Sequence, residues 1–259
     1  MDLGLKDDVA VVVGGASGLG HAIAAAFAAE GAAAVLIDVS PKVADVAAAL
    51  GGTGHVADVT DYAAVKGVAA GLGRVDHVVF AAGVGSGKFG FPFWNLDPSD
   101  WDRVLRVNLI GAANVAHAFA PRMAEAKKGT VLFLASVAGQ MGSQTDPPYS
   151  ASKAGVINFM QCAAKDLAPF GVRVNALCPG MVKTPLNKSV WQAWADQQPP
   201  EARVSYEAWA AEKIAKVVPL NRWQTPEDVA AMAVFLASER AANVTGQTVN
   251  VDGGFVMHW

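Results

Sequence analysis

The chain has 259 residues, of which 53% are hydrophobic and 17% charged, a composition that describes a soluble, core-rich globular protein and excludes intrinsic disorder. It carries 20 lysine and arginine residues against 23 aspartate and glutamate residues, and no basic run is long enough to bind nucleic acid or an anionic membrane as the main partner. We therefore expect a small-molecule ligand.

Short apolar runs alternate along the chain with longer, alanine-rich stretches, a rhythm that predicts βαβ units. Strands are predicted at residues 9–13, 33–37, 55–57, 76–80, 130–135, 172–177 and 247–251. Helices are predicted at residues 19–30, 42–50, 62–71, 98–123 with a break near Gly111, 150–169, and from about Pro226. The strands are continuously apolar, as expected when helices cover both faces of a parallel sheet. The sequence predicts an α/β fold with a doubly wound parallel sheet of about seven strands, in a single domain over residues 1–259.

Residues 184–222 interrupt this rhythm. The segment is long for a connection in a compact domain, and it carries Trp191, Trp194, Tyr206 and Trp209 among prolines and polar residues. Long excursions of this kind are usually lids or binding loops, so we interpret the segment as a substrate lid. The alternative is a small helical flap that packs its tryptophans on the core.

Cys162 and Cys178 are the only cysteines, and they form neither a CxxC pair nor a cluster with histidine, so neither a disulfide framework nor a zinc site is supported. No metal is expected. Residues 9–29 lack formal charge and are long enough to cross a membrane, but four glycines in the middle of the run argue against a membrane helix. The preceding residues are acidic, unlike the start of a signal peptide, so we expect a cytoplasmic protein that does not bind membranes.

The first predicted strand runs directly into a glycine-rich turn, Gly14 to Gly20, and then into a helix. Small residues let backbone N–H groups approach a pyrophosphate, whose charge the helix N-terminus offsets. The second predicted strand ends at Asp38, where a carboxylate can accept hydrogen bonds from the ribose of an adenine dinucleotide. Outside this context, Asp38 would be interpreted as a solvated loop residue.

The spacing Gly14-x3-Gly18-x-Gly20, followed by Tyr149-Ser-Ala-Ser-Lys153, resembles the short-chain dehydrogenase/reductase family over essentially the whole chain. Further matches follow in order: Asp58-Val59, Ala82-Gly83, Asn108, Ser136, the segment from Pro179 to Thr184, and the segment from Val251 to Gly254. The resemblance implies a Rossmann-like fold and a nicotinamide cofactor. It implies cofactor contacts from Gly14, Ser17, Gly18, Leu19, Gly20, Asp38, Asp58, Val59, Ala82, Gly83, Asn108, Tyr149, Lys153, Pro179, Gly180, Val182 and Thr184.

Two positions depart from the family pattern. Val13 stands where the family usually has threonine, and Phe80-Ala81-Ala82-Gly83 replaces the usual Asn-Asn-Ala-Gly. These threonine and asparagine side chains normally brace the loops around the cofactor, so we expect cofactor binding here to rely more on backbone contacts. Neither position transfers a proton.

Tyr149 and Lys153 are spaced i, i+4 on one predicted helix, so their side chains share a face and the ammonium can lie near the phenol. A free phenol has a pKa of about 10, and we expect Lys153 together with oxidised nicotinamide to lower it toward the range of a working acid/base. Ser136 resembles the family hydroxyl that holds the substrate oxygen. Lys153 also resembles the residue that holds the nicotinamide ribose, and Asn108 the one whose backbone holds a proton-feeding water.

The preferred function is an NAD-dependent oxidoreductase that interconverts a secondary alcohol and its ketone. NAD is favoured over NADP because Asp38 would repel a 2′-phosphate, while Gly15, Ala16 and Val39 offer no cation to pair with one. NAD preference in turn suggests alcohol oxidation in the cell. A cyclic alcohol, polyol or sugar-like substrate is expected, bound by Ser136, Gln140, Gln144, Tyr149 and Trp191.

Two alternatives remain. One is a 3-oxoacyl thioester reductase of the same family, against which the negative charge of Asp38 argues, because such enzymes usually prefer NADPH. The other is a non-catalytic protein that senses NAD/NADH, against which the intact Ser136, Tyr149 and Lys153 argue. The resemblance also implies a homotetramer, or a homodimer, built on the helices predicted at 98–123 and 150–169.

Overall fold

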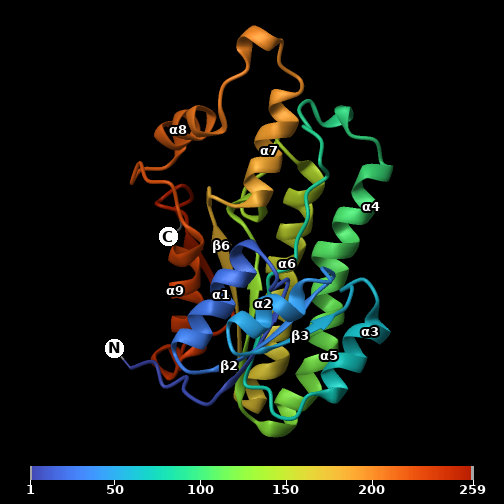
Figure 1. Cartoon of the computed structure of the whole chain (residues 1–259), viewed down its shortest axis with the longest axis vertical. Coiled ribbons are helices and arrows are strands. Elements are labelled where there is room, and N and C mark those ends of the chain that lie inside the picture. Colours follow the sequence, from blue (N-terminus) through green and yellow to red (C-terminus); the bar gives the residue numbers. More distant parts are fainter. Residues whose placement is uncertain (1, 258–259) are drawn as a thin grey trace.

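The computed structural model describes residues 2–257 and contains one sheet of seven parallel strands in the order β3-β2-β1-β4-β5-β6-β7 (Figure 1). The strands are β1 (Val9–Val13), β2 (Ala33–Asp38), β3 (Thr53–Val56), β4 (His77–Phe80), β5 (Gly129–Leu134), β6 (Val172–Pro179) and β7 (Thr248–Val251). β1 pairs with β2 on one side and with β4 on the other, so the strand order reverses between β1 and β4. In sheets of this kind, ligands bind at the carboxyl ends of the strands beside this reversal. The predicted fold class is confirmed.

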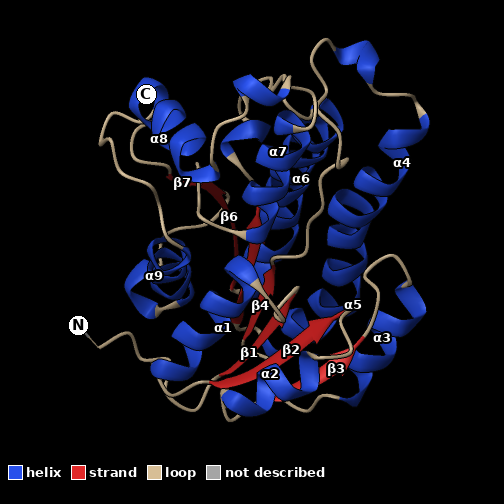
Figure 2. Ribbon diagram, turned by 45° about the horizontal axis from the view of Figure 1, so that its top comes forward, coloured by secondary structure: helices blue, strands red, loops and turns tan. Residues whose placement is uncertain are grey.

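Helices cover both faces of the sheet (Figure 2). One face carries α1 (Gly18–Ala29), α2 (Val43–Ala49) and α9 (Pro226–Ala237), whose apolar residues form one core cluster with the sheet. The other carries α3 (Tyr62–Gly71), α5 (Gly111–Ala126) and α6 (Pro147–Leu167), which form the second cluster. Two buried faces explain why the strands are continuously apolar.

Several predicted boundaries differ from the structure by one to three residues, and three elements show the differences most clearly. The helix predicted at 98–123 is divided into α4 (Ser99–Leu105), a π-helical turn (Arg106–Ile110) and α5, so the break lies just before Gly111. The helix predicted at 150–169 begins at Pro147 because Asp146 caps it and proline suits a first helical turn, and it ends at Leu167. β3 spans Thr53–Val56 instead of 55–57, because its backbone pairs there with Val35–Asp38 of β2.

The excursion between β6 and α9 contains two helices, α7 (Pro185–Ala195) and α8 (Tyr206–Val217), which project beyond the carboxyl ends of the strands at the top of Figure 1. Their apolar side chains pack mainly on one another, in a separate cluster around Tyr206, Trp209 and Ile214. The excursion therefore has a small core of its own. No helix within residues 2–257 is long and apolar enough to cross a membrane.

Candidate active site

The glycine-rich turn between β1 and α1 lies at the carboxyl edge of the sheet, against the loop that follows β4. Gly14 has a φ of +83°, and a Cβ on it would lie 2.5 Å from the backbone nitrogen of Ala82. A Cβ on Gly20 would lie 2.0 Å from the carbonyl oxygen of Gly14, so both positions require glycine. Ser17 makes no side-chain cap hydrogen bond within the described residues, which leaves the first N–H groups of α1 available to an anion.

Asp38 ends β2 beside this turn. Its Oδ2 accepts a hydrogen bond from the N–H of Ala16 at 3.0 Å, and its Oδ1 accepts one from Ser40 at 2.9 Å. After β3, the exposed Asp58 accepts hydrogen bonds from the backbone and hydroxyl of Thr60, while Val59 is buried. The predicted cofactor contacts of Asp38, Asp58 and Val59 therefore follow neighbouring strands at one edge of the sheet.

Asn108 lies in the π-helical turn, a feature often found at functional sites, and is fully buried. Its Oδ1 accepts from the N–H of Val84 at 2.8 Å, and its Nδ2 donates to the carbonyl of Val84 and to Oγ of Ser152. A Cβ on Gly83 would lie 3.4 Å from Nζ of Lys153 and 3.6 Å from Oδ1 of Asn108. The structure thus brings the loop after β4, the π-helical turn and the lysine of α6 together.

Tyr149 and Lys153 lie on one face of α6, as their spacing predicts. The Nζ of Lys153 is 5.5 Å from the centre of the Tyr149 ring, and it donates a hydrogen bond to the carbonyl of Leu134 at 2.6 Å. Ser136, which follows β5, is 9% exposed and hydrogen-bonds with Tyr149. The phenol, the ammonium and the hydroxyl therefore form one group at the ends of β5 and α6.

Burial changes the protonation of this group. It raises the pKa of Tyr149 to about 12, against the opposing hydrogen bond with Ser136, and it lowers the pKa of Lys153 to about 8. The protein without cofactor therefore holds the phenol pKa above its ordinary value, because desolvation disfavours the phenolate more than its neighbours favour it. Lowering of this pKa by Lys153 together with oxidised nicotinamide stays a prediction. Burial also raises the pKa of Cys178 to about 12, so this thiol is protonated and packs in the core.

The segment that follows Pro179, the last residue of β6, crosses the same carboxyl edge of the sheet. Gly180 donates its N–H to Val251, and Val182 forms an isolated bridge with Gln224. Thr184 caps α7 by accepting from the N–H of Asn187 at 3.2 Å. A Cβ on Gly18 would lie 4.0 Å from Pro185, so α7 begins beside the glycine-rich turn.

Some of the predicted substrate residues interact with other protein groups in the structure. The side-chain amide of Gln140 exchanges two hydrogen bonds with that of Asn250, at 2.7 and 2.9 Å. Trp191 donates to the carbonyl of Val204 at 3.2 Å, and its ring packs on Tyr206 with 5.8 Å between centroids. Gln144 is exposed. Ser136 and Tyr149 are thus brought together, whereas Gln140 and Trp191 interact with protein groups.

Sequence reasoning missed Asp146, a buried carboxylate three residues before Tyr149. It caps α6, and its Oδ2 accepts from the N–H of Ser86 at 2.8 Å. The Asp-Pro-Pro sequence was a usable signal, because aspartate before proline is typical of a helix start. Its link to Ser86, sixty residues earlier in the chain, had no sequence signal.

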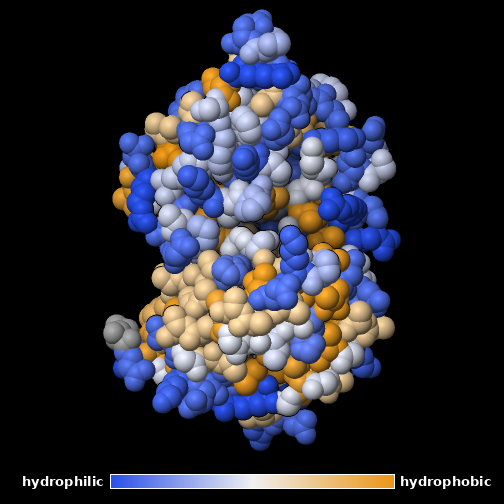
Figure 3. Space-filling model, viewed as in Figure 1, coloured by the Kyte–Doolittle hydropathy of each residue, from blue (hydrophilic) through white to orange (hydrophobic). Residues whose placement is uncertain are grey.

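The molecular surface is hollowed on one face. On the face shown in Figure 3, the hollow lies between the part formed by α7 and its neighbours and the part formed by α1 and α2. Among the described residues, no three His, Cys, Asp or Glu side chains are grouped to hold a metal ion.

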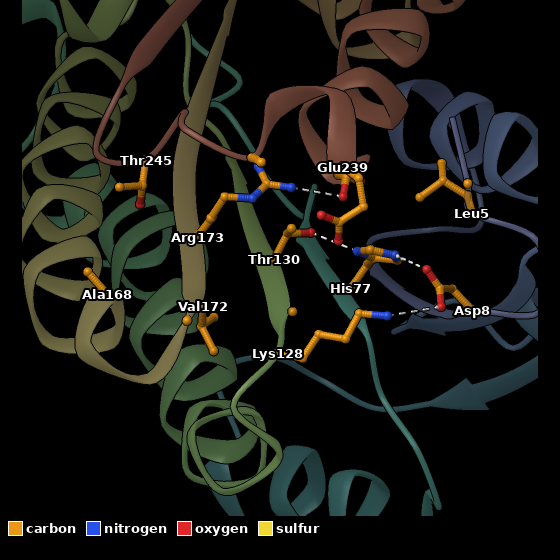
Figure 4. A pocket seen from close by; sticks show the side chains of 15 residues that line it. Leu5, Asp8, His77, Lys128, Thr130, Ala168, Val172, Arg173, Glu239 and Thr245 are labelled. Atoms are coloured by element: carbon orange, nitrogen blue, oxygen red, sulfur yellow. Dashed lines mark hydrogen bonds and ion pairs between the residues drawn. The ribbon is translucent and has the colours of Figure 1, made fainter. Parts of the chain in front are cut away.

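A second group of buried charges lies at the opposite, amino edge of the sheet, around a cavity of about 300 Å³ (Figure 4). His77 is 3% exposed, and its two ring nitrogens lie 2.8 Å from Oγ1 of Thr130 and 3.1 Å from Oδ2 of Asp8. Arg173 donates to the carbonyls of Leu236, Ala237 and Ser238 at the end of α9. These polar groups satisfy one another within the protein.

A family model described as enoyl-(acyl carrier protein) reductase matches residues 14–256. D-threitol dehydrogenase of Mycolicibacterium smegmatis is 35% identical over 99% of this chain and 95% of its own length. The chain belongs to the short-chain dehydrogenase/reductase family. It is thus an oxidoreductase that acts on a CH–OH group, in a family whose Rossmann-like fold binds a nicotinamide cofactor.

Two further relatives fit this family membership. Cis-4-hydroxycyclohexanecarboxylate dehydrogenase of Sinomonas cyclohexanicum is 37% identical over 95% of this chain and 96% of its own. The crystal structure of a 3-oxoacyl-[acyl-carrier protein] reductase with bound NAD from Brucella melitensis superposes with a TM-score of 0.82 and 33% identity, covering 98% of this chain and 92% of that one. Short-chain dehydrogenases/reductases with these names thus share the architecture of this chain over nearly its whole length.

Proposed function

We propose that the protein is an NAD-dependent dehydrogenase that interconverts a secondary alcohol, either cyclic or a polyol, and its ketone. The observation that carries this proposal is the group formed by Ser136, Tyr149 and Lys153 at the ends of β5 and α6. A proton-transfer group beside an anion-binding helix start suits the oxidation of a C–OH group.

In this proposal Tyr149 is the acid/base. During oxidation its oxygen accepts the alcohol proton, and during reduction its hydroxyl returns one to the ketone oxygen. Ser136 donates a hydrogen bond to the substrate oxygen and holds it beside the phenol. When bound, nicotinamide would supply the hydride chemistry, and its oxidised form would add a positive charge that favours phenolate over the neutral phenol. Asn108 holds the loop after β4 near Lys153, and its backbone is proposed to hold the proton-feeding water.

The residues at the carboxyl edge fit a dinucleotide. The glycines let the turn pack closely against its own backbone and the loop after β4, and the first N–H groups of α1, after Ser17, can bind a pyrophosphate. In this proposal Lys153 holds the nicotinamide ribose. The backbone from Pro179 to Val182 lies beside the nicotinamide carboxamide. Asp38 supports NAD over NADP, because a carboxylate hydrogen-bonds ribose hydroxyls and repels a 2′-phosphate.

The names of the relatives support an alcohol as substrate. They include a D-threitol dehydrogenase, named for a polyol, and a cis-4-hydroxycyclohexanecarboxylate dehydrogenase, named for a cyclic alcohol. The second candidate is reduction of a 3-oxoacyl thioester, the reaction in the name of the Brucella structure and of a Thermotoga maritima relative. We favour the alcohol because Asp38 suits NAD, and NAD preference suggests oxidation rather than reduction.

Three further features belong to the proposal. Residues 184–222 act as the substrate lid, since α7 begins beside the glycine-rich turn. The family resemblance supports a homotetramer, or a homodimer, and light scattering would measure the mass. Two cysteines without a disulfide suit a reducing compartment, which supports the cytoplasm.

The test is a screen for NADH formation with secondary alcohols, cyclic alcohols, polyols and sugars, beside NADPH oxidation with 3-oxoacyl thioesters. We expect NAD-dependent oxidation of at least one alcohol class, lost in the Tyr149→Phe variant. Turnover confined to NADPH and thioesters would overturn the substrate and cofactor assignment. Tight NAD binding without turnover on any substrate would favour the sensing alternative.

A further inference from the structure

Asp146 is a buried carboxylate that joins two parts of the candidate site. Its residue is 8% exposed, its Oδ2 accepts from the N–H of Ser86 at 2.8 Å, and its Oδ1 accepts more weakly from the N–H of Tyr149 at 3.4 Å. The first contact lies in the loop after β4, and the second in the first turn of α6. One side chain thus spans the loop and the turn that carries the phenol.

The loop after β4 is fitted closely around this carboxylate. A Cβ on Gly85 would lie 2.7 Å from Oδ2 of Asp146, and a Cβ on Gly90 would lie 2.5 Å from Cδ of Pro147. Gly90 also donates its N–H to the carbonyl of Thr145 at 2.8 Å. The loop therefore rests on the residues that lead into α6, with the carboxylate at the centre of the contact.

The same loop meets the lid. The Nε2 of Gln197 donates to the carbonyl of Phe89 at 3.4 Å, and Leu186 of α7 lies 3.9 Å from the Cβ position of Gly85. The loop from Val84 to Gly90 is thus placed between the lid and the start of α6.

We propose that Asp146 is a positioning residue, which fixes the loop from Val84 to Gly90 on the first turn of α6 and places a negative charge beside the Tyr149 phenol. This inference rests on the proposed role of Tyr149 as the acid/base. It adds to that role a carboxylate that controls when the phenol can lose its proton.

The charges around the phenol give the direction of the effect. On α6, the ammonium of Lys153 lies 5.5 Å from the centre of the phenol ring, and Asp146 caps the same helix three residues before Tyr149; on β6, Cys178 is protonated. In the loop, Lys88 pairs with Asp100 at 2.8 Å. Burial raises the pKa of Asp146, whose carboxylate in turn contributes to the high pKa of Tyr149. Removing this negative charge should therefore make the phenolate easier to form.

Two variants separate the charge from the positioning. Asp146→Asn keeps the size of the side chain and an oxygen that can accept from Ser86, but it removes the charge. Asp146→Ala removes the charge and both hydrogen bonds. Asp61→Asn is the matched control, because Asp61 caps α3 in the same way, by accepting from Ala63 and Ala64 at an exposed position.

The measurements are the pH profile of kcat/KM for alcohol oxidation and hydrogen exchange of the Ser86 amide. In Asp146→Asn we expect the rise in activity to move to lower pH by about 0.5 unit or more. In Asp146→Ala we expect Ser86 to lose protection and KM to rise about tenfold, as for one lost hydrogen bond to a charged group. Asp61→Asn should keep the wild-type profile and KM.

Each part of the inference can fail separately. A wild-type pH profile in Asp146→Asn would overturn the role of the charge. Wild-type KM and Ser86 protection in Asp146→Ala would overturn the positioning role. Retained turnover in Tyr149→Phe would instead overturn the proposed function itself, so the two failures are distinguishable.

Discussion

The amino and carboxyl edges of the sheet both carry buried charged side chains, but the two edges differ in whether these side chains form ion pairs. At the amino edge, Asp8 lies 2.6 Å from Arg74, 3.1 Å from His77 and 3.7 Å from Lys128. Arg74 also reaches Asp76 at 2.8 Å. At the carboxyl edge, the ion pairs within residues 2–257 include neither Asp146 nor Lys153.

This difference separates groups that stabilise the fold from groups that can react. Paired charges at the amino edge leave little for a ligand to neutralise, so they contribute to stability. At the carboxyl edge, burial raises the pKa of Tyr149 to about 12 and lowers that of Lys153 to about 8. Perturbed titratable groups beside a ligand cleft are typical of active sites.

Tyr149→Phe should lower kcat for alcohol oxidation by about 10²-fold or more, because the ring still packs but the acid/base is lost. The dissociation constant of NAD, from fluorescence titration, should stay near the wild-type value. Tyr62→Phe serves as the control, since the hydroxyl of Tyr62 contacts His117 on the exposed surface. Retention of more than a few per cent of wild-type kcat would contradict the role of Tyr149.

Asp38 should give NAD an advantage over NADP of about 10²-fold in kcat/KM, because it meets a 2′-phosphate as a like charge. The double variant Asp38→Ser with Val39→Arg removes the repulsion and adds a phosphate partner, so preference should move toward NADP. Asp45→Ser on α2 controls for the lost charge. Equal use of both cofactors by the wild type would remove the argument for NAD and for oxidation.

Asp8→Asn should lower the free energy of unfolding by about 1.5 kcal/mol, because Asp8 is buried and its hydrogen bonds with Arg74 and His77 lose the carboxylate charge. Urea denaturation measures this change. Asp102→Asn is the control: Asp102 pairs with Arg106 on an exposed helix surface, and its loss should cost about 0.5 kcal/mol or less. If the two variants lowered the free energy of unfolding equally, the ion pairs at the amino edge would contribute no more than exposed surface pairs.

The stability of the wild type should fall as pH drops below about 6.5, the ordinary pKa of histidine. Burial lowers the pKa of His77 in the folded protein, against the opposing effect of Asp8, so the unfolded chain binds the proton more readily. The folded state therefore loses stability from that pH down to the lowered folded-state pKa. Urea denaturation at several pH values should show a smaller loss in His77→Gln; equal pH dependence in both proteins would contradict this origin.

Trp191→Ala should raise KM by roughly three- to tenfold and change kcat less, since it removes one aromatic pair from the small core of the lid. Substrate together with cofactor should also increase the hydrogen-exchange protection of residues 184–222. High protection of the whole segment in the free protein would indicate a rigid flap, and Trp191 would then be a core residue.

Local patterns predicted much of the fold and part of the site. Continuous apolar strands identified the parallel sheet, because burial on both faces leaves a direct mark on the sequence. The i, i+4 spacing placed Lys153 near Tyr149, because a helix fixes that geometry. The start of α6 was wrong by three residues, because the cap at Asp146 extended the helix over two prolines.

Contacts between distant segments could not be predicted. Gln140 pairs with Asn250, 110 residues later, and His77 pairs with Asp8, 69 residues earlier. Such pairs depend on how loops meet after the sheet has formed, which no local pattern records. The phenol pKa was also beyond the sequence, because it depends on burial as much as on the nearby lysine.

The most direct test of the comparison measures kcat and the free energy of unfolding side by side for Tyr149→Phe and Asp8→Asn. The expected outcomes are opposite: Tyr149→Phe loses about 10²-fold or more in kcat with stability close to wild type, and Asp8→Asn loses about 1.5 kcal/mol of stability with kcat close to wild type. A stable, active Tyr149→Phe protein, or an Asp8→Asn protein of wild-type stability, would contradict it.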